Sequence, residues 1–337
     1  MLKKFIKTAS EGNDLSVEKM KEAMNMIMTG QSNDAQIAAF LTALRMKGES
    51  VDEIYAAAKV MRDRGHKVEF EKEIILDTCG TGGDGAKTFN ISTGVSIVAA
   101  AAGICVAKHG NRALTSRSGS ADVFAALGVN IEMTPEEMKL CVQKAGIAFL
   151  FAPGCHKAMK YAMNVRKEIG IRTIFNLLGP LANPARNTHH LMGVFDEELT
   201  EKAAGVLKKM GNVHSLVVCG EGNVDEAVLS GYTKISELKD GEIMTYRIKP
   251  EEFGIAVSSL EAIAGGSPEE NAEIITEIFS GQRKDAYYDA LVFNGGIALY
   301  TADAAADIKE GIRAAKDIID SGKAALKMNE FVECSNK

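Results

Sequence analysis

The stretch Asp77-Thr-Cys-Gly-Thr-Gly-Gly-Asp-Gly85 follows a short apolar run, Ile74-Ile-Leu76, and this order predicts a buried strand that runs into a glycine-rich loop. Four glycines leave the backbone of the loop unshielded, so it can adopt positive φ angles and point several N–H groups at one anion. A strand followed by such a loop indicates an α/β protein that binds a phosphorylated ligand.

A second strand is predicted at Ile104–Ala107, and it ends in the polar loop Lys108-His-Gly-Asn-Arg112. We expect a helix to begin after each loop, near Ser92 within Asn90-Ile-Ser-Thr-Gly94 and again within residues 115–122. The carboxyl ends of parallel strands meet at one edge of a sheet, which is where open α/β folds bind ligands. Both loops should therefore face the same site.

The remaining sequence predicts two kinds of structure. Up to about residue 65, apolar residues recur at helical spacing in segments 15–29, 34–46 and 51–64, which are too short to be stable unless they pack together or on a partner subunit. From residue 71 onward, short strands alternate with helices, as in a parallel sheet with right-handed crossovers. The predicted fold class is α/β, with a small all-helical domain and a large α/β domain whose mainly parallel central sheet is flanked by helices.

Further elements are predicted along the α/β part. Strands are expected at 73–76, 147–151, 190–195 and 216–219, an antiparallel ribbon at the sheet edge at 234–248, and helices at 136–144, 157–168, 198–210, 268–279, 286–300 and 308–321. Two prolines make Gly179–Pro184 a predicted loop or hinge, and residues 333–337 are expected to be frayed.

Composition excludes several classes of protein. The 337 residues are 46% hydrophobic and 25% charged, as in a soluble globular protein, and the formal charge of −6 argues against a nucleic-acid binder. The apolar runs are too short to cross a membrane, and no apolar leader follows the first basic residues. Six cysteines without a C-x-x-C pair suit reduced thiols, so we expect a cytoplasmic protein without zinc.

The glycine loop also matches G-x-G-x-x-G, the dinucleotide-binding fingerprint, from Gly80 to Gly85. Asp84 inside the loop would repel a bare pyrophosphate, and Cys105 stands where an acidic ribose partner is expected about 20 residues on. A P-loop is a near miss as well, because Ala86 separates the last glycine from Lys87. A pyrophosphate site that admits a magnesium ion beside Asp84 fits better.

Two other groups could take part in such a site. Val224-Asp-Glu226 follows a predicted strand, and its carboxylates could bind metal, although an ordinary acidic turn is the alternative. Arg166 lies late on a predicted helix, where it could bind a carboxylate or simply form a surface ion pair. His156 and the pair His189-His190 have no metal-ligand spacing with the cysteines, and the pair is interpreted as structural.

With these pieces assembled, the chain resembles the anthranilate phosphoribosyltransferase family over essentially its whole length. The resemblance is carried by Asp77–Asp84, Asn90-Ile-Ser-Thr93, Lys108–Arg112, Ser118-Gly-Ser-Ala-Asp122, the long block Val165–Pro180 and Val224-Asp-Glu226. Pyrimidine nucleoside phosphorylases share the architecture and are the alternative, but their glycine loop differs and they lack the Asn-Ile-Ser-Thr and Val-Arg-Lys-Glu blocks.

The resemblance implies an enzyme of tryptophan biosynthesis that transfers the phosphoribosyl group of phosphoribosyl pyrophosphate, bound with Mg²⁺, to anthranilate. It implies a helical domain at residues 1–68, joined by a segment near 165–187, and an α/β domain at 69–337. Homodimers would form through the helical domain. Lys157 stands where the family commonly has proline, in the loop at the anthranilate entrance.

Site residues are carried over by position. Lys108 and Asp84 would be catalytic, and Ser92, Asp225 and Glu226 would hold magnesium. Anthranilate would contact Gly80, Asn111 and Arg166. The phosphoribosyl pyrophosphate site would be lined by Gly80, Gly83, Asp84, Thr88, Asn90, Ile91, Ser92, Thr93, Lys108, His109, Gly110, Asn111, Arg112, Ala113, Leu114, Thr115, Ser116 and Ser120.

Overall fold

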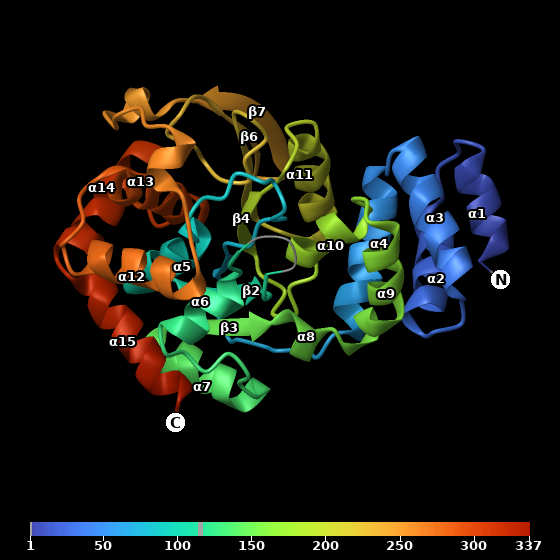
Figure 1. The fold of residues 1–337 in the computed structure, drawn as a ribbon, viewed down its shortest axis with the longest axis horizontal. Coiled ribbons are helices and arrows are strands. Elements are labelled where there is room, and N and C mark those ends of the chain that lie inside the picture. The colour runs from blue at the N-terminus through green and yellow to red at the C-terminus, as the bar shows by residue number, and fades with distance from the viewer. Residues whose placement is uncertain (1, 114–116) are drawn as a thin grey trace.

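A computed structural model describes residues 2–113 and 117–337, and it shows a small helical lobe beside a large α/β lobe (Figure 1). One hydrophobic core lies in the α/β lobe, and a second extends from the helical lobe onto the sheet, where it includes Met192, Val217 and Leu238. The predicted fold class is confirmed. None of the helices in the described part of the chain is long and apolar enough to span a lipid bilayer.

The helical lobe is built from the N-terminal helices α1 (Lys3–Ser10), α2 (Val17–Met28), α3 (Asp34–Lys47) and α4 (Val51–Arg64). Ser16, Asn33 and Ser50 cap α2, α3 and α4 with their side chains, as short helices require. Two later helices, α9 (Lys160–Ile169) and α10 (Phe175–Leu181), add apolar residues to the same core, so a distant segment of the chain completes this lobe.

The α/β lobe contains a seven-stranded sheet in the order β3-β2-β1-β4-β5-β6-β7. The strands are β1 (Ile75–Asp77), β2 (Cys105–Gly110), β3 (Ile147–Phe151), β4 (His189–Gly193), β5 (His214–Gly220), β6 (Thr233–Lys239) and β7 (Glu242–Ile248). β1 to β5 are parallel, with Leu76 opposite Val106 and His189, while β6 and β7 form the predicted antiparallel ribbon at the edge.

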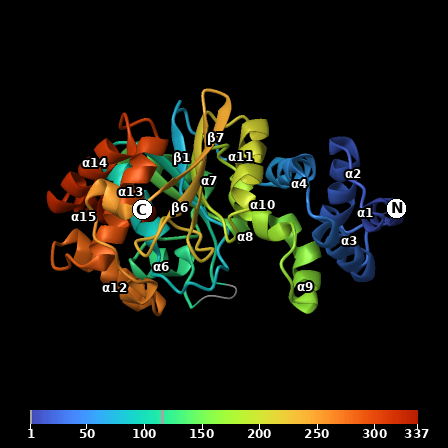
Figure 2. The same ribbon diagram turned by 90° about the horizontal axis from the view of Figure 1, so that it is seen from above.

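Helices cover both faces of the sheet. The helices of the α/β lobe are α5 (Ile91–Ala101), α6 (Ser120–Ala126), α7 (Pro135–Ala145), α8 (Ala152–Cys155), α11 (Leu199–Met210), α12 (Pro268–Phe279), α13 (Ala286–Thr301), α14 (Ile308–Asp320) and α15 (Lys323–Ser335). Figures 1 and 2 show α5, α13 and α14 on one side of the sheet and α10 and α11 on the side of the helical lobe.

Two local predictions were wrong. Of the loop or hinge predicted at 179–184, Gly179 to Leu181 belong to α10, and only residues 182–184 are irregular. Pro180 removes the backbone donor that would bond to the carbonyl of Asn176, and the helix ends one residue later. The C-terminal residues are not frayed from position 333, because α15 extends to Ser335 and buries Phe331 and Cys334 against the α/β core.

Candidate active site

The glycine loop is held against the end of β4 and against Asp225. Thr81 donates its backbone N–H to the carbonyl of Gly193 at 2.9 Å, and Gly82 donates its N–H to Oδ2 of Asp225 at 2.6 Å. A Cβ on Gly80 would come within 2.8 Å of that same carboxylate oxygen, so only glycine lets the loop approach so closely. The glycine loop and the Val224-Asp-Glu226 turn are therefore in direct contact and hold each other in place.

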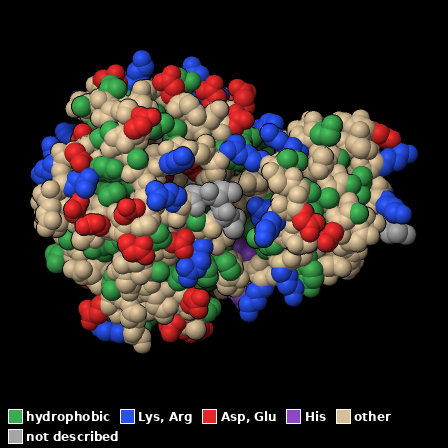
Figure 3. Space-filling view, in the orientation of Figure 1, with side chains coloured by type: hydrophobic (Ala, Val, Ile, Leu, Met, Phe, Trp, Pro, Cys, Tyr) green, Lys and Arg blue, Asp and Glu red, His purple; other side chains and the backbone are tan. Residues whose placement is uncertain are grey.

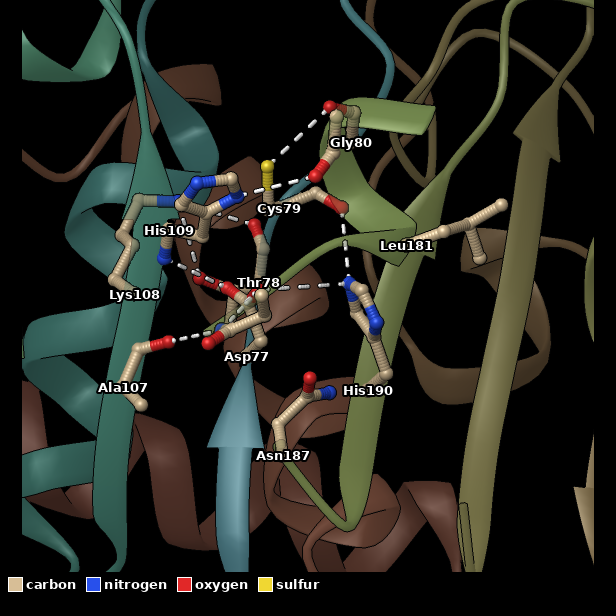
Figure 4. Close-up of polar contacts among 12 residues, drawn as sticks. Asp77, Thr78, Cys79, Gly80, Ala107, Lys108, His109, Leu181, Asn187 and His190 are labelled. Atoms are coloured by element: carbon tan, nitrogen blue, oxygen red, sulfur yellow. Dashed lines mark hydrogen bonds and ion pairs between the residues drawn. The ribbon is translucent and has the colours of Figure 1, made fainter. Parts of the chain in front are cut away.

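Lys108 enters the same space from β2. Its side chain is 1% exposed, and Nζ donates to the carbonyl of Thr78 at 3.1 Å, to Oγ1 of Thr78 at 3.3 Å and to Oγ of Ser92 at 3.3 Å. Figure 4 shows the lysine directed at the start of the glycine loop. The second strand was predicted to end at Ala107, but β2 continues to Gly110, so Lys108 meets the start of the glycine loop from within the neighbouring strand.

Three carboxylates lie beside this loop. Asp84 accepts a hydrogen bond from the backbone N–H of Asp225 at 3.2 Å, and Glu226 follows directly. Burial, and then repulsion by Asp84, raises the pKa of Asp225 to about 7, and burial with repulsion by Asp225 raises the pKa of Glu226 well above its usual value. Buried carboxylates that repel one another in this way are stabilised by a cation.

These donors fit magnesium. Asp225 and Glu226 line a small cavity together with Thr78, Gly80 and Ser92, so a carboxylate pair and a hydroxyl share one space. Among residues 2–113 and 117–337, no three His, Cys, Asp or Glu side chains form a ready-made metal cage. Mg²⁺ does not need one, because it commonly binds through one or two carboxylates, waters and the phosphates of a substrate.

A buried polar network supports the loop from below. Asp77, at the end of β1, accepts hydrogen bonds from the N–H of His109 at 3.2 Å and from Nδ2 of Asn183 at 2.7 Å. His109 donates Nδ1–H to the carbonyl of Gly179 in α10 at 3.1 Å, and His190 donates Nε2–H to the carbonyl of Cys79 at 3.0 Å (Figure 4). This network ties the strand ends to the segment that joins the two lobes.

The loop after β2 is folded around Asp122. Its carboxylate accepts hydrogen bonds from the N–H groups of Ala113 and Gly119, at 2.9 and 3.1 Å, and from Arg112 at 3.0 Å. Burial alone would raise the pKa of Asp122, but these bonds outweigh it and hold the pKa below its usual value. Arg112 is thereby positioned at the strand end. The predicted site residues Leu114, Thr115 and Ser116 lie outside the described residues.

The start of α5 contributes its predicted residues in different ways. Asn90 accepts hydrogen bonds from Oγ of Ser118 at 3.1 Å and from Nδ2 of Asn271 at 2.8 Å, which fixes its amide beside the second loop. Ile91 and Thr93 are fully buried, so neither residue is exposed to the site in this structure. Thr88 forms an isolated bridge with Ala264.

The remaining predicted positions lie at the two strand-end loops. Gly83 is in the glycine loop with φ of +71°, and Gly110 ends β2. A Cβ on Gly110 would meet Oγ of Ser120 at 2.2 Å, so these two residues are in close contact at the start of α6. Asn111 follows, with Oδ1 accepting the N–H of Arg112 at 2.8 Å.

Arg166 lies on α9, in the helical lobe. Its guanidinium stacks 5.4 Å from the ring centre of Phe175, and burial lowers its pKa. Its Nη1 contacts Sδ of Met163 at 3.7 Å, and none of the ion pairs within the described residues includes Arg166, so its charge is available to a ligand. No described hydrogen bond joins it to Gly80 or Asn111, the other two positions predicted for anthranilate.

Arg172 was missed by the sequence analysis. Its guanidinium donates to the carbonyl of Gly83 and lies 4.2 Å from the ring centre of Phe195. It reaches the glycine loop from the segment between α9 and α10, so it links the two lobes across the site. The sequence contains it within the block Val165–Pro180, but its partner is 89 positions away and nothing in the local pattern points to that contact.

On the face of the molecule shown in Figure 3, Lys and Arg side chains gather around the hollow between the two lobes. Such a concentration of positive charge attracts an anionic ligand into a cleft and raises its rate of association. The net charge of the chain is −6, so this positive charge is a local feature of the hollow. The hollow therefore suits a substrate that carries several negative charges.

Comparison with known proteins gives the family. The model of the glycosyl transferase family, a/b domain, matches residues 72–325, and that of the glycosyl transferase family, helical bundle domain, matches residues 3–65. An anthranilate phosphoribosyltransferase from Acetivibrio thermocellus is 49% identical over 336 residues, which cover 100% of this chain and 97% of the relative.

Solved structures agree with this match. The crystal structure of anthranilate phosphoribosyltransferase from Thermus thermophilus superimposes with a TM-score of 0.94 at 40% identity, covering 99% of both chains. The enzyme from Saccharomyces cerevisiae in complex with PRPP and Mg gives a TM-score of 0.91 at 29% identity, covering 99% of this chain and 98% of the yeast chain. Because the likeness in sequence and in structure extends over the whole length, the chain belongs to the anthranilate phosphoribosyltransferase family.

Proposed function

We propose that this protein transfers the phosphoribosyl group of 5-phosphoribosyl 1-pyrophosphate to the amine of anthranilate, giving N-(5-phosphoribosyl)anthranilate and pyrophosphate in tryptophan biosynthesis. The observation that carries the proposal is the meeting of Lys108, the glycine loop and the Asp225-Glu226 pair in one space, in a chain of this family. An anionic leaving group and its cation would both be held there.

In this reaction the bond from the anomeric carbon to the amine nitrogen forms as the bond to pyrophosphate breaks. Negative charge grows on the leaving oxygens, and the amine proton passes to solvent. Lys108 is already held by Thr78 and Ser92, so its ammonium group is preorganised beside that charge. Free N–H groups of the glycine loop would add to this stabilisation.

Ser92, Asp225 and Glu226 are proposed to hold Mg²⁺, which would neutralise charge on the pyrophosphate when bound. Asp84 accepts a hydrogen bond from the backbone N–H of Asp225. This bond would hold the Val224-Asp-Glu226 turn against the glycine loop. The other positions named for the phosphoribosyl pyrophosphate, from Gly80 to Ser120, remain proposed contacts, including Leu114, Thr115 and Ser116.

Anthranilate is proposed to lie between the lobes, with its carboxylate on Arg166 and its ring near Gly80 and Asn111. A planar guanidinium suits a carboxylate because it can bind both oxygens at once. The aromatic amine is weakly basic and is unprotonated at neutral pH, so no strong general base is required. The site therefore acts by binding, alignment and charge stabilisation.

The wider organisation is also proposed. Residues 1–68 with the segment near 165–187 would form the helical domain and the dimer interface, residues 69–337 would form the substrate-binding domain, and the homodimer would act in the cytoplasm. Met20, Met24 and Met28 are buried inside the helical lobe, so their side chains do not face a partner subunit. A homodimer would form through the outer faces of the helices.

The test is to follow anthranilate fluorescence as phosphoribosyl pyrophosphate is added with Mg²⁺. The signal should fall with time only when both substrates and the metal are present. The alternative activity, pyrimidine nucleoside phosphorolysis, predicts ribose 1-phosphate from uridine and inorganic phosphate. A steady anthranilate signal together with uridine cleavage would refute the proposed reaction.

A further inference from the structure

A second cavity lies where the helical lobe meets the α/β lobe, away from the glycine loop. Its volume is about 260 Å³, and it opens between α4, the residues that precede β4 and the C-terminal end of α11. Figures 1 and 2 both show α4 beside α11. Polar and aromatic side chains dominate its walls, namely Tyr55, Lys59, Arg62, Arg186, Asn187 and Lys209.

The cavity is at the opposite end of the sheet from the candidate active site. Asn187 precedes β4, while Gly193 ends the strand and contacts the glycine loop. Asn187 and Gly193 are six positions apart, and at about 3.3 Å per residue of extended chain the two ends are separated by about 20 Å. Figure 4 shows Asn187 below the sheet edge on which Thr78, Cys79 and Gly80 lie. The two sites do not share a lining residue.

Four cationic side chains line the cavity, and nearby carboxylates neutralise only part of their charge. Lys59 pairs with both oxygens of Asp63, at 2.7 and 2.6 Å, and Lys209 pairs with Asp52 at 2.8 Å. Arg186 is 3.8 Å from the same Asp63, a long contact to a carboxylate that Lys59 already occupies. Two carboxylates therefore serve three of the cations.

Arg62 is the fourth cation, and it is buried. It is 7% exposed and donates from Nη2 to the carbonyl of Leu181 at 3.1 Å, while its Nε has no hydrogen-bond partner within the described residues. Burial, and then the charge of Arg186, lowers the pKa of Arg62 to about 10. A buried guanidinium without a carboxylate, next to a second guanidinium, is stabilised by an anion.

The kind of cation in the wall narrows the choice of anion. Arg62 and Arg186 both line the cavity and are close enough for the charge of one to lower the pKa of the other. Guanidinium groups are well matched to phosphate oxygens, because each can bind two of them at once. Asn187 fixes the floor of the cavity through the hydrogen bond from its Nδ2 to the carbonyl of His189 at 3.0 Å.

We propose that this inter-lobe cavity is a binding site for a phosphate group, held by Arg62, Arg186 and Lys209 and distinct from the candidate active site. The bound group would join α4 of the helical lobe to α11 of the α/β lobe. Free phosphate and the phosphate of a sugar monoester share this chemistry, and the experiment separates them.

The experiment measures binding of inorganic phosphate and ribose 5-phosphate to the full-length protein by calorimetry at constant ionic strength. It uses Arg186→Asn with Lys209→Gln, because asparagine tolerates the positive φ of Arg186 and both side chains are accessible. The control carries Lys208→Gln with Arg313→Gln, which removes the same charge from exposed positions on α11 and α14. Lys108→Met removes a cation of the active site instead.

We expect phosphate to bind to the wild type, to the charge control and to Lys108→Met, and to bind at least tenfold more weakly to the cavity variant. A preference for ribose 5-phosphate would identify a sugar phosphate, and a preference for inorganic phosphate would identify the free ion; either supports the site. Absence of millimolar binding, equal weakening in the charge control, or loss in Lys108→Met alone would overturn it.

Discussion

The carboxylate of Asp225 accepts the backbone N–H of Gly82 at 2.6 Å, across 143 positions of sequence. This bond couples the proposed metal-binding turn to the loop that would hold the pyrophosphate. Because Asp225 uses Oδ2 for this bond, its other oxygen can face a cation while the loop stays in place. Changes at the turn should therefore affect both metal binding and the geometry of the loop.

We predict that Asp225→Asn with Glu226→Gln reduces turnover at least 100-fold and raises the Mg²⁺ concentration needed for half-maximal activity. Without metal the same variant should be more stable than the wild type at pH 8, because two buried, mutually repelling carboxylates are replaced by neutral amides. Activity against Mg²⁺ and thermal unfolding in metal-free buffer measure the two effects. Unchanged magnesium dependence would remove both residues from the metal site.

Arg166→Ala is predicted to raise the KM for anthranilate about 10- to 100-fold with a smaller change in kcat. The contact between guanidinium and carboxylate is made in the ground state as well as at the barrier, so its loss should appear mainly in KM. Since Arg166 also stacks on Phe175, Arg166→Lys tests whether charge alone restores binding. An increase confined to the KM for phosphoribosyl pyrophosphate would show that Arg166 serves the other substrate.

Arg172→Met should raise the KM for phosphoribosyl pyrophosphate, because the arginine donates to the carbonyl of Gly83 and keeps the glycine loop ordered against the helical segment. Methionine retains much of the apolar stem that lies on Phe195 while it removes the hydrogen bond. Exchange of the loop amides with deuterium should be faster in the variant. An unaltered KM and unaltered exchange would mean that the loop is held by Asp225 and Gly193 alone.

Periodicity and turn chemistry were enough to predict the alternation of helices and strands, and β3 and α12 have the predicted bounds. Parallel strand ends also explain why the glycine loop and Lys108 meet. The contact of Arg172 with Gly83 could not be predicted in this way, because it depends on how two lobes pack. The same is true of α10, where contacts of Phe175 and Leu178 with the helical core outweigh the preference of Gly179 and Pro180 for a turn.

Gly193→Ala is predicted to destabilise the protein by roughly 2–4 kcal/mol and to abolish activity. A Cβ at this position would lie 1.6 Å from the carbonyl oxygen of Asp225, so the strand end or the metal-binding turn must move. Gly154→Ala is the matched control, because nothing lies within 4 Å of its Cβ and its φ is not positive. Chemical unfolding of both variants measures the difference, and equal stability would mean that the turn yields without cost.

A polar cluster around Glu237 lies at the end of the sheet opposite the glycine loop. Glu237 is 5% exposed and accepts hydrogen bonds from His214 at 3.1 Å, Tyr300 at 2.7 Å and Tyr246 at 2.8 Å. Burial alone would raise its pKa, but these donors lower the pKa from 4.5 to about 2. Because the folded pKa is depressed, the stabilisation is fully present above pH 4.5 and is lost as the pH falls toward 2.

Glu237→Gln should therefore lower the free energy of unfolding by a constant amount above about pH 5. Below about pH 5 the gap in the free energy of unfolding between the wild type and the variant should shrink, by about 1.4 kcal/mol per pH unit at most. Urea unfolding at pH 6, 4.5 and 3.5 measures the gap. Glu242→Gln on β7 is the control, because that carboxylate is exposed and should give a small gap at every pH. If the gap for Glu237→Gln stays constant down to pH 3.5, the ionised carboxylate does not stabilise the fold through its three donors.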